Sequence, residues 1–261
     1  MKFAIIIIFL AYSFYAFAQK GTVYCSWGYN KEWYTKSDIK IKQTELGNDY
    51  VFNDVHASDK PGWDKDLLKE HFTIPQYNYR LGYFYKENEA IELNFDHTKY
   101  NVNQEQFIKI TGKYNGRNMD TLVYADSNRV LTYQLNNGAN FFLFNHVNRI
   151  TLKEYYKGNV RFDFLFKKGI GFMVPHVENT IMGYDNDPHF QLSGWNVGME
   201  AGVKVSLFKY FYLEFTNKFD YARYRNLRIY NGTAKQAFGT FELILNAGFN
   251  IPILKKKEVP Q

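Results

Sequence analysis

Twelve charged side chains occupy equivalent positions in segments where polar and apolar residues alternate. They are Arg80, Glu92, Asp96, Arg161, Asp163, Lys167, Glu200, Lys204, Glu214, Lys218, Asp220 and Glu242. In a strand, an alternation of period two places every polar residue on one face of the sheet. If these faces enclose a common interior, we expect the twelve to pair with one another, because burying each charge alone would cost several kcal/mol.

The histidines give no sign of a metal or cofactor site. His56, His71, His97, His146, His176 and His189 are scattered along the chain without the spacing of a ligand pair. In "FDHTKY", Asp96 and His97 fall on opposite faces of the strand, which argues against a local Asp-His couple. The sequence also contains no nucleophile elbow, phosphate-binding glycine loop or zinc helix. It therefore predicts no metal and no cofactor.

The elements that carry the charges are predicted strands. Between residues 194 and 225, the apolar side chains of Trp195, Val203 and Phe215 alternate with the polar side chains of Lys204 and Glu214, and both arms exceed the ~9 to 11 residues that cross a bilayer. We predict ten strands, with eight or twelve as alternatives, at residues 21–30, 36–43, 48–57, 74–86, 89–101, 139–156, 159–174, 190–207, 211–224 and 236–253.

Connection lengths distinguish a membrane barrel from a soluble sandwich. Tight links ("ELGN", "KENE", "YYKGN", "LFKY") alternate with longer polar links near residues 57–73, 102–138, 175–189 and 225–235. Outer-membrane barrels have short periplasmic turns and long extracellular loops, whereas sandwiches show no such alternation. We therefore predict an all-β, transmembrane, antiparallel up-and-down barrel. The segment 102–138 contains a further hairpin, which either extends the barrel above the membrane or raises the strand count to twelve.

The N-terminus and composition agree with export to the outer membrane. Residues 1–18 have the basic start, apolar run and small-residue end of a cleaved signal peptide, which leaves one domain at 19–261. A single cysteine excludes an intramolecular disulfide. Aromatic residues make up 19% of the chain although its mean hydropathy is -0.43, a pairing typical of barrels. The formal charge of +6 suits outer-membrane lipid and lipopolysaccharide as partners rather than nucleic acid.

One stretch invites comparison with an enzyme. The barrel family of lipid A deacylases uses a His-x-Ser pair, and "FNHVNRI" places Asn148 two residues after His146. An amide cannot replace the serine nucleophile. Ser193 has no histidine near it in sequence. The residues therefore favour a protein without enzymatic activity, and a lipid-modifying hydrolase is the alternative.

Three longer stretches carry a family resemblance. They are "SWGYNKEWYTKSDI", "TIPQYNYRLGYF" with "DHTKY", and "GWNVGMEAGVKV". Together they resemble a family of predicted bacterial outer-membrane β-barrel proteins over most of the mature chain. The resemblance implies the location and the architecture but no activity. One departure is that such barrels commonly end on an aromatic residue, whereas here "LKKKEVPQ" follows the last strand.

The expected function is structural, or binding at the cell surface through long extracellular loops. The predicted loops carry rings and charges suited to contact with a glycan or a protein: Lys60, Trp63, Lys65, Tyr184, His189, Arg225, Arg228 and Tyr230. We expect the paired charges to fill the barrel interior, because a narrow barrel leaves little free bore. A narrow solute channel is the other alternative.

Overall fold

The structure, a computed structural model, describes residues 20–60, 76–125, 130–135 and 138–253. The predicted signal peptide at 1–18 and the predicted loop residues Trp63 and Lys65 lie outside these ranges. No helix within them is long and apolar enough to cross a membrane.

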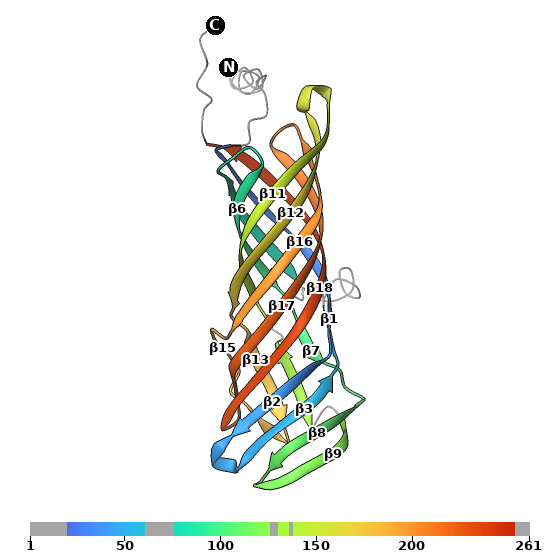
Figure 1. The fold of residues 1–261 in the computed structure, drawn as a ribbon, viewed down its shortest axis with the longest axis vertical. Coiled ribbons are helices and arrows are strands. Elements are labelled where there is room, and N and C mark those ends of the chain that lie inside the picture. The colour runs from blue at the N-terminus through green and yellow to red at the C-terminus, as the bar shows by residue number, and fades with distance from the viewer. Residues whose placement is uncertain (1–19, 61–75, 126–129, 136–137, 254–261) are drawn as a thin grey trace, which may run out of the picture.

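Eight antiparallel strands form a ring (Figure 1). They are β1 (Thr22–Tyr34), β5 (Tyr77–Phe84), β6 (Glu89–His97), β11 (Phe141–Tyr155), β12 (Val160–Met173), β16 (Trp195–Leu207), β17 (Phe211–Ile229) and β18 (Gly232–Pro252). Strand β1 pairs with β5 on one side and with β18 on the other, so the pairings return to their start. Strand β18 is therefore the closing strand, although no aromatic residue ends the chain.

The register fixes the width of the ring. We followed the directly opposed residues from strand to strand, starting at Trp33 of β1 and going once around the ring. The path returns to β1 at Val23, so the register is staggered by ten residues. A stagger of this kind requires strands tilted by ~35–45° to the axis. The interior of an eight-stranded barrel is just wide enough for side chains to fill. The ring therefore has a narrow interior, called the lumen below.

The outer face of the ring is apolar. On β16 the outward side chains of Val197, Met199 and Val203 are 43%, 57% and 44% exposed, whereas the alternate residues Glu200 and Lys204 are buried. Exposed apolar residues continue around the ring on every strand. An outward apolar band over an inward polar face is the arrangement of a transmembrane barrel, and it confirms the predicted faces of β16.

Two predicted strands form but lie outside the ring, which therefore has eight strands, one of the predicted alternatives to ten. Strands β2 (Ser37–Gln43) and β3 (Asn48–Val55) pair with each other, and β2 pairs with Thr233–Gln236 at the far end of β18. The physical reason is polarity. Asp38, Lys40 and Lys42 occupy the outward face of β2, and three charges in succession cannot face lipid.

Two connections also differ from the prediction. The "ELGN" turn joins β2 to β3 and so lies at the opposite end of the ring from "KENE", "YYKGN" and "LFKY". The predicted long loop at 225–235 is instead a tight link, because β17 continues to Ile229 and β18 begins at Gly232. The two ends of the described chain meet at the end of the ring that carries the "KENE" turn, where the Ile253 amide donates to the Gly21 carbonyl at 2.8 Å.

We call the structure beyond the end of the ring where β2 pairs with β18 the cap. It comprises the limb β2-β3-β8-β9, a second sheet and the outer ends of β17 and β18. The remaining strands are β4 (Ala57–Ser58), β7 (Tyr100–Val102), β8 (Gln106–Tyr114), β9 (Arg117–Ala125), β10 (Leu131–Leu135), β13 (His176–Ile181), β14 (Tyr184–Asp185) and β15 (His189–Phe190). The 102–138 segment thus extends the molecule beyond the ring and adds no strand to it.

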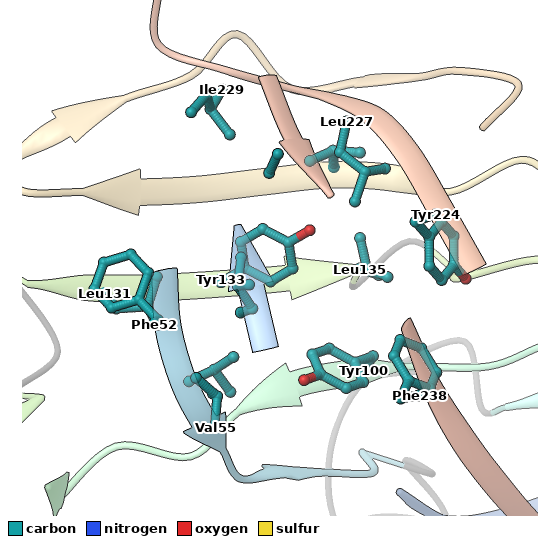
Figure 2. Packing of buried hydrophobic residues seen from close by; sticks show 14 of the residues in the cluster. Phe52, Val55, Tyr100, Leu131, Tyr133, Leu135, Tyr224, Leu227, Ile229 and Phe238 are labelled. Carbon is teal, nitrogen blue, oxygen red and sulfur yellow. The ribbon is translucent and has the colours of Figure 1, made fainter. Parts of the chain in front are cut away.

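The cap has its own apolar core (Figure 2). Tyr100, Tyr133 and Leu227 are fully buried and come from three different strands. Tyr100 stacks on Phe238 of β18 with ring centroids 4.7 Å apart, and its hydroxyl accepts a hydrogen bond from Gln236 at 2.6 Å. Because the core also includes Phe141, at the start of a ring strand, the apolar interior of the cap continues into the ring.

Candidate functional site

The structure places the twelve predicted charges inside the ring. Each is at most 4% exposed: Arg80, Glu92, Asp96, Arg161, Asp163, Lys167, Glu200, Lys204, Glu214, Lys218, Asp220 and Glu242. They come from six of the eight ring strands, namely β5, β6, β12, β16, β17 and β18. Of the other two ring strands, β1 contributes a further acidic residue that is described below.

Lys167 lies at the centre of one group of carboxylates. Its Nζ is 3.2 Å from Glu92, 3.0 Å from Glu200 and 2.6 Å from Glu214. These partners belong to β6, β16 and β17, and Lys167 itself is on β12. One ammonium group therefore links three strands to its own through the lumen.

Lys218 forms a second group nearer the cap. Its Nζ is 2.7 Å from Asp96 and 3.2 Å from Glu242, and it also pairs with Asp220. Arg80 connects the two groups, since its guanidinium lies 2.6 Å from Asp96 and 3.9 Å from Glu200. The charges of both groups thus form one continuous network across the lumen.

The other two cations lie apart from this network. Arg161 pairs with Asp163 at 2.9 Å on the same strand. Lys204 instead lies among rings, with its Nζ 3.6 Å from the ring centroid of Tyr212 and 4.9 Å from that of Tyr24, and it donates to Asn250 at 3.2 Å. Cation–π contacts of this kind stabilise a buried ammonium without a carboxylate.

Sequence reasoning missed Glu32. This residue is 2% exposed and lies directly opposite Glu242 in the pairing of β1 with β18. Asn30 donates to both carboxylates, at 2.9 Å and 3.4 Å. The signal was available, because the alternation of the first strand continues to Tyr34 rather than ending at residue 30.

Asp59 lies where the ring meets the cap. It accepts a hydrogen bond of 2.8 Å from the backbone amide of Glu32. Burial raises the pKa of the Asp59 carboxyl to about 7, and hydrogen bonds from the backbone amides of Glu32 and Lys60 oppose that rise. This carboxyl group therefore titrates near neutral pH.

The described residues contain no catalytic triad of the kind that the predicted hydrolase alternative requires. His146 points outward, and its Nε2 contacts both the Tyr85 hydroxyl at 2.9 Å and Glu89 at 3.3 Å. A relay needs both ring nitrogens, one for the nucleophile and one for the orienting acid. The hydroxyl of Ser193 donates to the backbone carbonyl of Arg225 at 2.5 Å. Among the same residues there is no group of three or more metal-ligating side chains.

The outer surface of the cap carries an apolar patch on the β8–β9 hairpin. We define it by Phe107, Leu122 and Tyr124, which are 69%, 63% and 48% exposed. Phe107 and Tyr124 are directly opposed, with ring centroids 5.1 Å apart. Strand β9 ends the order of the twelve-stranded sheet, so within the described part of the chain one edge of β9 has no strand beside it. We call this surface the edge patch.

The predicted loop residues that the structure describes lie in different places. Tyr184 and Tyr230 stack at 4.8 Å between ring centroids on the cap surface. His189 contacts the backbone carbonyl of Asp187 at 2.8 Å. Arg225 is an exposed residue of β17, not of a loop, because that strand extends past the predicted end. These residues therefore form no single site.

Several solved structures that match the chain are outer-membrane proteins. OprG of Pseudomonas aeruginosa matches with a TM-score of 0.41 and 10% identity over 89% of this chain and 97% of that chain. Ail, the attachment invasion locus protein of Yersinia pestis, matches with a TM-score of 0.33 and 11% identity over 89% of this chain and 99% of that chain. The outer-membrane protease OmpT of Escherichia coli matches with a TM-score of 0.37 and 8% identity over 91% of this chain and 98% of that chain. No model of a known protein family matches the sequence, and no curated protein matches it.

The protein is an outer-membrane β-barrel. This assignment depends on the ring, its apolar outer face and its polar lumen. The matches to solved structures, with identities of 8–11% and TM-scores of 0.33–0.41, are not part of this assignment.

Proposed function

We propose that this outer-membrane barrel binds a protein partner at the cell surface through the edge patch of its cap. The observation that carries the proposal is the combination of exposed rings with a free strand edge. Contiguous exposed apolar residues commonly mark interaction sites. An unpaired edge offers backbone N–H and C=O groups to an extended segment of another chain.

The surroundings of the edge patch suit strand addition. Strand β9 has nine residues and contains no proline, so its backbone can pair along its whole length. Strand β9 pairs with β8, and β8 is anchored in the cap core by Ile108 and Ile110, which are both at most 1% exposed. A partner strand would thus meet a pre-formed surface and would lose little affinity to ordering of the cap.

Peptide selection on the intact barrel tests this proposal. Random peptides displayed on phage are selected against the full-length protein in nanodiscs, and the affinities of enriched peptides are then measured. We expect alternating apolar sequences whose binding falls at least tenfold when Leu122 and Tyr124 are both changed to Ser. Asp120→Pro should have a similar effect, because Asp120 lies in a non-hydrogen-bonded pair with Thr111 of β8 and its backbone N–H therefore points to the free edge.

Matched changes elsewhere on the cap provide the control. Tyr184→Ser with Tyr230→Ser removes two exposed rings from another part of the cap and should leave peptide affinity unchanged. Equal losses in this control, or peptides whose affinity is unchanged by Asp120→Pro, would contradict binding by strand addition.

The filled lumen supports a binding protein over a channel. The charge network occupies the middle of the lumen, and the aromatic side chains of Tyr24, Phe84 and Tyr212 form a buried cluster inside the ring. We expect no steady conductance in planar bilayers. A stable open current from the wild-type protein would favour the channel instead.

A further inference from the structure

A basic crevice lies on the outer surface where the cap joins the ring. It has a volume of about 840 Å³ and lies against β17, β18 and β2. Its cationic side chains are Lys36, Lys40, Arg223, Arg225 and Lys235. Only two carboxylates, Asp38 and Asp54, line the same crevice, so positive charge is in excess.

The crevice begins where the lipid-facing surface ends. Trp195 and Tyr221 are outward-facing aromatic residues of the ring whose rings lie 5.9 Å apart. Arg223 is directly opposite Trp195 and follows Tyr221 on the same face of β17. One two-residue step along a strand is ~6–7 Å. Aromatic residues mark the boundary between hydrocarbon and water in such barrels, so the arginine lies at the level of lipid headgroups.

Most of the positive charges in the crevice lack a carboxylate partner among the described residues. Lys235 and Lys40 are directly opposed across the pairing of β18 with β2, an arrangement that costs free energy because like charges repel. Lys40 has an exposed ion pair with Asp49 at 3.4 Å. In the described ranges, no side chain forms an ion pair with Arg223, Arg225 or Lys235. An anion in the crevice would relieve this repulsion.

A bulge in β17 lies at the second arginine. The register with β18 shifts between Tyr224 and Leu227, and Asn226 takes a positive φ of 56°. Ser193 and Gln191 hold the bulge by donating to the carbonyls of Arg225 and Asn226, at 2.5 Å and 2.9 Å. Bulges commonly re-aim a side chain next to a functional site. Two arginines therefore flank one crevice on a braced backbone.

We propose that this crevice binds the phosphate groups of an outer-leaflet glycolipid, the headgroup of lipid A. Guanidinium groups bind phosphate through two parallel hydrogen bonds, and lysines add charge. The position beside Trp195 and Tyr221 would let the acyl chains lie against the ring while the phosphates reach the cations. This site is separate from the edge patch, so it does not depend on the proposed protein partner.

Lipid retention by the intact barrel tests the site. The protein is reconstituted in nanodiscs that contain either bisphosphorylated or dephosphorylated lipid A, and the affinity for each lipid is measured by native mass spectrometry after extraction into mild detergent. We expect the wild-type protein to prefer the phosphorylated lipid. The change Arg223→Gln, Arg225→Gln, Lys235→Gln should lower that preference at least tenfold.

A control removes the same charge elsewhere. Lys109→Gln, Lys113→Gln, Arg117→Gln on the β8–β9 hairpin should leave the lipid preference unchanged. Equal preference in the wild-type protein and the crevice variant would overturn the proposal. So would equal binding of inorganic phosphate and lipid A, because it would show that the crevice does not recognise a lipid. If the triple variant does not fold, Lys235→Gln alone should still reduce the preference, and an unchanged preference there would also count against the site.

Discussion

The ring and the cap share two long strands but have opposite polarity. In the ring section of β17, Glu214 and Lys218 point inward and Phe215 points outward. In the cap section of the same strand, Leu227 points inward and Arg228 points outward. A strand presents its polar side chains wherever the surroundings are polar, so the ring turns them away from lipid and the cap turns them toward water.

This contrast explains how each region is stabilised. The ring has lipid outside and therefore encloses its charges, which must pair because burial of a single charge is costly. The cap has water outside and buries apolar residues as a soluble domain does. The same change should therefore have different consequences in the two regions, and four predictions follow from the largest expected effect to the smallest.

Lys167→Met should destabilise the ring most. It leaves Glu92, Glu200 and Glu214 without their common cation, and breaking a buried ion pair in this way costs about 3–5 kcal/mol. The temperature at which the barrel unfolds, read from heat-dependent migration on a denaturing gel, measures the loss. Lys168→Met changes the adjacent outward residue and should have little effect. Equal losses in both variants would show that the lumen pairs contribute nothing.

Leu227→Ala should open the cap and leave the ring intact. Removing a fully buried leucine costs about 2–5 kcal/mol, and here the loss falls on the cap core. Limited proteolysis in nanodiscs should cleave the cap faster, while heat-dependent migration of the ring stays as in the wild type. The neighbouring exposed residue gives the control, Arg228→Ala. A ring that unfolds together with the cap would mean that the two regions are one cooperative unit.

An arginine on the outer surface should distinguish lipid from water. Val203→Arg places a charge on the lipid-facing side of β16, at a cost of about 2–4 kcal/mol near the bilayer midplane. Leu122→Arg makes the same kind of change on the exposed surface of the cap and should be tolerated. The amount of folded protein in the membrane fraction measures both. Normal levels of the Val203 variant would mean that this face does not meet lipid.

The pH dependence of the junction should be the smallest effect. The pKa of Asp59 is raised to about 7, above the usual value for aspartate, so the folded protein binds this proton more tightly than the unfolded chain does. Its contribution is fully present below about pH 4 and is lost as the pH rises through about 7. We expect the cap to melt at a lower temperature at pH 8 than at pH 5. Asp59→Asn should remove that difference, and a difference that persists would assign it to another group.

The ring strands could be predicted because their alternation is local. The misplacement of β2 shows the limit of that reasoning, since "SDIKIKQ" alternates as a ring strand does but with charges on the face that lipid would occupy. In β17 the bulge after Tyr224 shifts the alternation by one residue, so the sequence indicated a loop where the strand continues.

The partners within the lumen could not be predicted. Lys167 is separated by 75 residues from Glu92 and by 47 from Glu214, and nothing in either segment specifies the other. Their contact depends on the stagger of the ring, which sets the height of each residue in the lumen. The crevice depends in the same way on β2 joining the far end of β18.

The sequence by itself determined that the chain forms long strands with one apolar and one polar face, because a side-chain period of two is a property of each segment alone. It also determined which residues share a face. Only the tertiary structure decided that eight strands form the ring, that two further predicted strands join the cap, and which charges meet. The reason is that these depend on register between distant segments, and register is set by all the pairings together.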